Sequence, residues 1–143
     1  MSLKEPTSKM SKSHVDERSR ILLSDSTEDI QKKVNAALTD SDLKISYDPV
    51  RRPGVSNLIE ILSHIEGTPC DELVLEHESA SLRALKERVS TSLANHMKGI
   101  REIYFGLIDD KTGYLDSVAE EGAHAACANS EVTMKQVRAS LGL

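Results

Sequence analysis

The sequence predicts an all-α fold, a helical bundle preceded by a flexible loop segment. Residues with high helix propensity (Ala, Leu, Glu and Lys) are plentiful, whereas aromatic residues make up only 3% of the 143 residues. Apolar residues recur at helical steps of three and four over long stretches. No pair among the seven glycines has the spacing of a phosphate-binding turn. An autonomous nucleotide-binding α/β domain is therefore not expected.

The first helix is predicted to begin at Ser26, whose hydroxyl can cap it three residues before the carboxylate of Asp29. Its apolar face should then consist of Ile30, Val34, Ala37 and Leu38. We expect Asp40-Ser41-Asp42 to end it. A short extended stretch should follow around residues 44–47, with turns at Asp48-Pro49 and Arg52-Pro53-Gly54.

Three more helices and a turn are predicted before the last helix. The second helix should run from Gly54 to Glu66 and stop at Gly67 and Pro69, and a short helix should run from Cys70 to about His77. The longest periodic segment spans Leu82 to Leu107 and is followed by a turn over 109–113. The last helix is predicted over 114–141, with an inner face made of Leu115, Val118, Gly122, Ala126, Val132, Val137 and Leu141.

Charge divides the chain unevenly. Residues 1–20 carry five basic and three acidic side chains, whereas the whole chain has a net charge of −5. We therefore expect two parts, a basic loop segment over 1–20 and a helical domain over 21–143. The acidic body argues against wholesale wrapping of nucleic acid. No apolar run reaches membrane-spanning length, and two cysteines are too few for a disulfide framework, so no membrane association and a reducing compartment are expected.

The string Lys9-Met10-Ser11-Lys12-Ser13 is the most informative part of the leading segment. Two lysines three residues apart, interleaved with hydroxyls, suit a clamp for a polyphosphate. On chemistry alone, a solvated Ser/Lys-rich terminus is the competing interpretation. His14 follows directly and is a further candidate for a phosphate contact.

As a literal string, KMSKS resembles the second signature loop of class I aminoacyl-tRNA synthetases. Its surroundings resemble the bacterial or mitochondrial type of tryptophanyl-tRNA synthetase over essentially the whole chain, in the expected order. The strings that carry this resemblance are Met1-Ser2-Leu3, Glu5-Pro6-Thr7, Ala37-Leu38-Thr39-Asp40-Ser41, Tyr47-Asp48-Pro49, Arg52-Pro53-Gly54-Val55-Ser56-Asn57-Leu58, Tyr114-Leu115-Asp116, Glu121-Gly122-Ala123 and Leu141-Gly142.

The resemblance implies a tryptophan–tRNA ligase. Such an enzyme activates L-tryptophan with ATP and Mg²⁺, forming tryptophanyl-adenylate and pyrophosphate, and then transfers the amino acid to tRNA(Trp). The catalytic residues implied are Lys9 and Lys12, which would stabilise the departing pyrophosphate. Ser11 and Ser13 would complete the ATP-binding loop, with Met10 as a packing anchor. The helical domain would face the tRNA, including its anticodon.

The sequence also departs from that family. Its members carry a nucleotide-binding α/β half before this loop, with a HIGH-type motif and the tryptophan pocket, and no H-x-G-H-like tetrapeptide occurs here. Met1 matches what looks like an internal methionine. We therefore expect the C-terminal part of the enzyme, inactive by itself. The family works as a homodimer through contacts mainly in the other half, so a monomer is the alternative for this chain. The mitochondrial matrix is the favoured location, and the cytoplasm is the other.

Two function classes stay open at this point. One is part of a tryptophan–tRNA ligase, and the other is a free-standing, non-catalytic helical module that binds tRNA or a partner. The intact KMSKS string favours the first, since a mere binder has no need of a pyrophosphate clamp. Histidine and cysteine spacings do not suit a zinc site, so no metal ligand is predicted. Charge alone makes Lys32, Lys33, Lys98 and Arg101 candidates for tRNA contacts. Arg51 and Arg52 are further candidates for contacts with tRNA phosphates, although a solvated or salt-bridged turn is the favoured interpretation for them.

Overall fold

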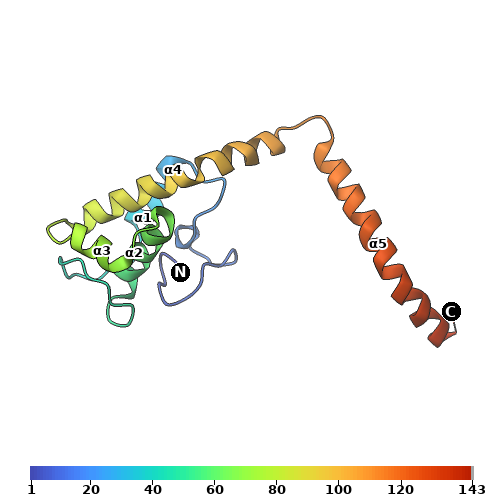
Figure 1. Cartoon of the computed structure of the whole chain (residues 1–143), viewed down its shortest axis with the longest axis horizontal. Coiled ribbons are helices and arrows are strands. Elements are labelled where there is room, and N and C mark those ends of the chain that lie inside the picture. The colour runs from blue at the N-terminus through green and yellow to red at the C-terminus, as the bar shows by residue number, and fades with distance from the viewer. Residues whose placement is uncertain (143) are drawn as a thin grey trace. The chain divides into compact units, whose positions relative to one another are not determined.

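A computed structural model describes residues 1–142, and within them all regular secondary structure is helical (Figure 1). The predicted all-α class is confirmed. The elements are a short 3₁₀ turn η1 (Glu17–Ser19) and the helices α1 (Thr27–Asn35), α2 (Pro53–Glu66), α3 (Cys70–Glu76), α4 (Leu82–Ile108) and α5 (Tyr114–Leu141). The chain forms two compact units, Met1–Glu102 and Ile103–Leu143.

The first unit is organised around α2. Most of the N-terminal half of this helix is buried, and Val55, Leu58, Ile59 and Leu62 are completely covered. Apolar side chains of α1, α3 and α4 complete the core, namely Ile30, Val34, Leu73, Leu85, Val89 and Ala94. Full burial of one such aliphatic side chain is worth about 1.5–3 kcal/mol. The core therefore places α1, α2, α3 and the first part of α4 relative to one another.

Helix α1 begins where the sequence predicts and ends earlier. The Ser26 hydroxyl accepts a hydrogen bond from the Asp29 N–H at 3.1 Å, which confirms the cap. The helix ends at Asn35 rather than near Asp40, and the predicted core residue Leu38 is 54% exposed. The expected apolar face is therefore wrong at that position, while Ala37 is buried just past the helix.

Lysine ammonium groups explain the early end of α1. Lys4 Nζ donates to the Ala36 carbonyl at 2.7 Å, and Lys86 Nζ donates to the carbonyls of Asn35 at 3.1 Å and Ala37 at 2.9 Å. Cations at a helix C-terminus satisfy carbonyls that lack a partner and oppose the negative end of the dipole. Burial, together with the nearby Lys4, lowers the pKa of Lys86.

Helix α2 begins at a close approach of two backbones. Pro53 stands at its first turn, and a Cβ added at Gly54 would collide with the Leu38 carbonyl oxygen. The helix ends at Glu66, and Gly67 caps it with a φ of 73°, as the sequence predicts. Gly54 therefore permits a contact that no larger residue could make, and Gly67 adopts a backbone conformation that other residues avoid.

The predicted ranges of α3, α4 and α5 are also confirmed, whereas the predicted inner face of α5 is not. None of its described residues is buried within the second unit, including Leu115, Val118 and Val137. The periodicity correctly predicts a helix, but this unit consists of the end of α4 together with α5, too few helices to enclose an apolar face.

Two further sequence predictions can be placed on this structure. The stretch over residues 44–47 is part of no helix or strand, and Ile45 from it is buried. Among the described residues, no helix is long and apolar enough to span a membrane. The domain boundary after residue 20 stays a prediction. The last residue of the predicted helical domain, Leu143, lies outside the described residues.

Candidate functional site

The leading segment is joined to the helical core at both of its ends. Leu3 is only 2% exposed, and its N–H donates to the Ser19 carbonyl at 2.9 Å. The Leu3 carbonyl accepts from the Leu38 N–H at 2.8 Å. Asn57 of α2 donates its side-chain amide to the Ser2 carbonyl at 3.3 Å. Residues 4–18 therefore form a loop whose base is fixed, and the KMSKS string (Lys9–Ser13) lies within that loop.

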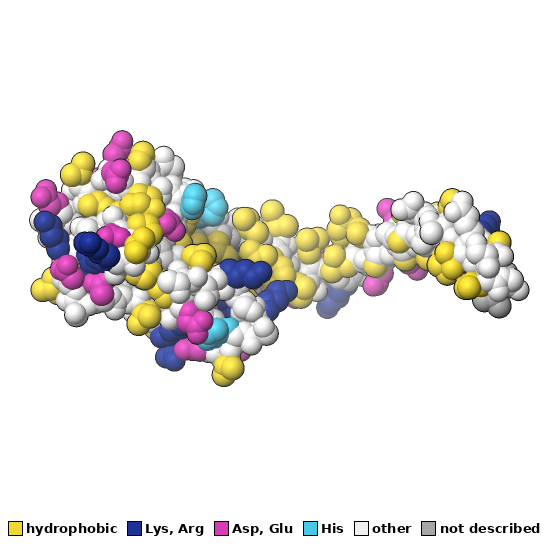
Figure 2. Space-filling view, turned by 90° about the horizontal axis from the view of Figure 1, so that it is seen from below, with side chains coloured by type: hydrophobic (Ala, Val, Ile, Leu, Met, Phe, Trp, Pro, Cys, Tyr) yellow, Lys and Arg dark blue, Asp and Glu magenta, His cyan; other side chains and the backbone are white. Residues whose placement is uncertain are grey.

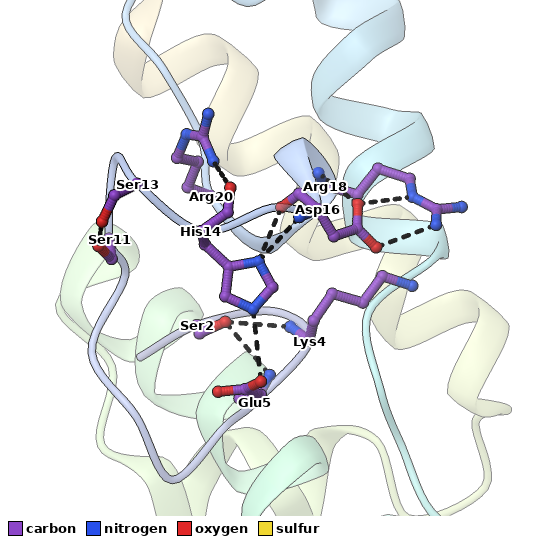
Figure 3. A network of polar contacts seen from close by, with 9 residues as sticks. All are labelled: Ser2, Lys4, Glu5, Ser11, Ser13, His14, Asp16, Arg18 and Arg20. Carbon is purple, nitrogen blue, oxygen red and sulfur yellow. Dashed lines mark hydrogen bonds and ion pairs between the residues drawn. The ribbon is translucent and has the colours of Figure 1, made fainter.

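His14 holds the end of the KMSKS string in a polar network (Figure 3). Its Nδ1 accepts from the Asp16 N–H at 3.0 Å, and its Nε2 lies 3.4 Å from the Glu5 Oε1. Arg20 Nη1 donates to the His14 carbonyl at 3.0 Å. The imidazole ring of His14, the candidate for a phosphate contact, therefore already has protein partners, and so does the His14 carbonyl.

Asp16 contributes the only strongly shifted carboxyl group within the described part of this loop. Its carboxylate accepts from the Arg18 Nε at 3.0 Å and from Nη2 at 2.9 Å, and also caps η1 through the Arg18 N–H at 2.9 Å. These hydrogen bonds lower the pKa of Asp16 to about 2 and raise that of Arg18. The Arg18 charge therefore offsets that of Asp16, which limits repulsion of an anion near the loop.

The two KMSKS lysines differ from every residue of this network. Lys9 and Lys12 are exposed, and neither makes a hydrogen bond or ion pair with another described residue. Between them Met10 packs against the hydrophobic core, as expected of an anchor, and the Ser11 and Ser13 hydroxyls lie 3.0 Å apart. The structure thus gathers two cations without internal carboxylate partners and two hydroxyls on one loop with a fixed base, a combination suited to phosphate oxygens.

The other basic candidates divide into structural and exposed residues. Arg52 is 9% exposed and its guanidinium is enclosed by acceptors, which confirms the salt-bridged turn. Lys33 forms a largely buried ion pair with Asp25 at 2.6 Å, and Arg101 donates to the Asp25 carbonyl at 2.9 Å. Lys32, Lys98 and Arg51 are exposed. On the face seen in Figure 2, acidic and basic side chains are intermingled over the first unit.

Sequence reasoning missed the residues that brace the loop. Glu5 and Arg20 lie nine residues before and six residues after His14, and no periodicity or motif marks such pairs. Lys4 and Lys86 were equally unmarked, because their roles depend on where α1 ends. Within residues 1–142 no group of three or more His, Cys, Asp or Glu residues is placed to hold a metal ion.

Comparison with known proteins gives consistent matches. Residues 1–98 match the family model described as tRNA synthetases class I (W and Y). The chain is similar to the tryptophan–tRNA ligase of Bacillus subtilis, with 33% identity over 143 residues, covering 100% of this chain and 43% of that protein. It is also similar to the mitochondrial tryptophan–tRNA ligase of Saccharomyces cerevisiae, with 38% identity over 144 residues, covering 99% of this chain and 38% of the relative.

A solved structure agrees with these relatives. Tryptophanyl-tRNA synthetase from Mycoplasma pneumoniae superposes with a TM-score of 0.72 and 26% sequence identity, covering 100% of this chain and 43% of that one. The chain therefore spans less than half the length of the relatives it matches, and it aligns with their C-terminal part.

Proposed function

Because this chain belongs to the tryptophanyl-tRNA synthetase family of class I, we propose that its KMSKS loop serves the activation of L-tryptophan by ATP. In this proposal the tryptophan carboxylate attacks the α-phosphorus, and the bond to pyrophosphate breaks. The tryptophanyl group is then transferred from the adenylate to tRNA(Trp), and AMP leaves. These activities belong to the whole enzyme of the relatives, and the 143 residues contribute the loop and a helical body.

The observation that carries the proposal is the state of Lys9 and Lys12. Both ammonium groups are exposed and have no acceptor among the described residues, although the loop around them is rich in hydrogen bonds. Negative charge grows on pyrophosphate as it leaves, so cations already in place stabilise the transition state more than the bound ATP. The hydroxyls of Ser11 and Ser13 can donate to the same phosphate oxygens.

Mg²⁺ would enter this arrangement on the ATP phosphates. The loop offers ammonium and hydroxyl groups, which suit phosphate oxygens, whereas Mg²⁺ prefers carboxylates from protein, and no group of three or more His, Cys, Asp or Glu residues within residues 1–142 is placed to hold it. Bound with ATP, the ion would neutralise part of the charge on the phosphates. The chain's own residues would orient the leaving group and balance the rest of its charge.

The helical body is proposed to face tRNA(Trp). Lys32, Lys98 and Arg51 are exposed cations that can meet phosphates, since the ion pairs of Lys32 with Asp29 and of Arg51 with Asp48 are solvent-exposed. Arg52 and Lys33 are instead occupied by internal carboxylates. The matching relatives are bacterial and mitochondrial enzymes, so the proposed place of action is the mitochondrial matrix or the cytoplasm.

The decisive experiment is Lys12→Ala in a full-length context, with this chain joined to the remaining part of the Bacillus subtilis relative. Tryptophan-dependent ATP–pyrophosphate exchange should fall roughly 10²- to 10³-fold, the usual cost of removing one transition-state donor. Affinity for tRNA(Trp) should be unchanged.

Lys111→Ala provides the matched control, because Lys111 is another exposed lysine in a turn. It should leave exchange at the unmodified level. An exchange rate for Lys12→Ala equal to that of the unmodified chimera would rule the proposal out and favour a non-catalytic tRNA- or partner-binding module. The 143 residues by themselves should show no exchange.

A further inference from the structure

An apolar cavity lies beneath the KMSKS loop. Its volume is about 210 Å³, and Met10 forms part of its wall. The rest of the wall comes from separate elements of the first unit, among them Leu3, Val34 of α1, and Leu93 and Met97 of α4. Met10 and Met97 are 87 positions apart in the sequence. The loop and the helical body therefore meet at this cavity.

Met10 is the contact that holds the middle of the loop. The base is fixed by hydrogen bonds on each side, with the Ser2 N–H donating to the Ser8 carbonyl at 2.7 Å and Arg20 to the His14 carbonyl at 3.0 Å. Between these points the described backbone has a single 3.4 Å hydrogen bond, from the His14 N–H to the Ser11 carbonyl. Met10 is also the only apolar side chain in the KMSKS string.

The geometry points to Met10 as a positioning residue, whose packing in the wall of this cavity against the core sets where Lys9 and Lys12 stand. Because Leu93 and Met97 form part of the same wall, a shift of α4 changes the surface against which Met10 packs. The loop lysines are thereby coupled to the helical body through an apolar contact. The catalytic consequence rests on the function proposed above, whereas the anchoring of the loop does not.

The flexibility of methionine suits this role. An unbranched, flexible side chain adapts to an irregular apolar surface such as this wall. Replacement by Gln keeps a similar length but places an amide against apolar walls, which is unfavourable without hydrogen-bond partners. Replacement by Leu keeps the apolar contact. Met10→Gln and Met10→Leu therefore separate polarity from size at this position.

Trypsin offers a direct readout on the chain itself, since it cleaves after Lys12. Cleavage in a folded protein follows the population in which the loop is open. Met10→Gln should speed cleavage after Lys12 about tenfold, because loss of a partly buried apolar contact shifts opening by about that factor. Met97→Gln should act in the same direction without altering the loop sequence. Met10→Leu should cleave at close to the unmodified rate.

Met134→Gln is the matched control, because Met134 is an exposed methionine of α5. It should leave cleavage after Lys12 unchanged. Thermal unfolding of each variant separates local opening from global loss of structure. Unchanged cleavage in both Met10→Gln and Met97→Gln would overturn the anchoring of the loop.

The exchange assay of the full-length context tests the catalytic consequence. Met10→Gln should lower the kcat of ATP–pyrophosphate exchange while leaving the KM for tryptophan unchanged, and Met10→Leu should restore it. Accelerated proteolysis with an unaltered kcat would overturn the positioning role. A Lys12→Ala rate equal to the unmodified rate would instead remove the proposed function, so the two failures are distinguishable.

Discussion

The KMSKS loop and the turn that precedes α2 use positive charge in opposite ways. Lys9 and Lys12 are exposed and make no polar contact with another described residue. Arg52, in contrast, donates to both carboxylate oxygens of Asp40, at 2.6 and 2.9 Å, to the Asp42 carbonyl at 3.0 Å, to the Ser46 hydroxyl at 2.9 Å and to the Lys44 carbonyl. Both regions lie in the same compact unit.

The difference shows what each region can do. A guanidinium whose donors are all taken has little left for a ligand, and its function is to close the loop over residues 40–46 onto α2. A pair of lysines without internal acceptors contributes little to stability but is available to an anion. A pair of basic residues occurs in both regions, Lys9 and Lys12 in the loop and Arg51 and Arg52 in the turn, so the basic residues alone do not distinguish them. The number of internal acceptors around each cation does distinguish them.

Removal of Arg52 should have the largest effect on stability. Arg52→Met leaves the Asp40 carboxylate and the carbonyls of Asp42 and Lys44 without their donor. Breaking a buried ion pair costs about 3–5 kcal/mol, and because Asp40 is about one-third exposed, we expect about 2–4 kcal/mol. Urea unfolding followed by circular dichroism measures it. The control is Lys12→Met, the same loss of a cation at an exposed site, which should stay within about 0.5 kcal/mol. Equal losses in both variants would contradict the comparison.

A methyl group at Gly54 should have the next largest effect. In Gly54→Ala the new Cβ meets the Leu38 carbonyl oxygen, so the start of α2 and the backbone at Leu38, just after α1, must separate. Overpacking of this kind costs about 1–3 kcal/mol. Gly122→Ala is the matched control in α5, where a Cβ meets no atom within 4 Å and helix propensity should give a slight gain. Thermal unfolding of both variants checks this, and a stabilised Gly54→Ala protein would show that the close approach is not required.

Asp40→Asn should have the smallest effect, and that effect should depend on pH. The Arg52 guanidinium lowers the pKa of Asp40 below its ordinary value of 3.8, so the folded state holds the charged form more strongly than the unfolded state does. The stabilisation is fully present above pH 3.8 and is lost as the pH falls through the lowered pKa.

The free energy of unfolding should therefore differ by roughly 1–2 kcal/mol between the unmodified protein and Asp40→Asn at pH 7, the difference between hydrogen bonds to charged and to neutral acceptors. The gap should close in acid. Asp42→Asn is the control, since that carboxylate lies 4.0 Å from the guanidinium and is 64% exposed, and it should give a smaller gap. A gap for Asp40→Asn that stays constant from pH 7 to pH 2.5 would contradict the role given to its charge.

Local signals were sufficient for most helix boundaries. Ser26 and Gly67 act through hydrogen bonds and backbone angles within a few residues, so a sequence pattern contains nearly all of the relevant physics. The end of α1 was placed incorrectly, because it depends on the ammonium groups of Lys4 and Lys86, which come from distant parts of the chain. The five residues of the KMSKS string were identified from the sequence, and their catalytic roles remain proposals.

The sequence by itself determined the all-α class, the position of the KMSKS string and the family to which the chain belongs. Only the tertiary structure decided which basic residues are available, since the acceptors of Arg52 and Lys33 reach them through folding. It also decided that Met10 shares a cavity with Met97 and that His14 is held between Glu5 and Arg20. The physical reason is range: helix propensity and capping act between neighbours, whereas burial and charge pairing join residues that only the fold brings together.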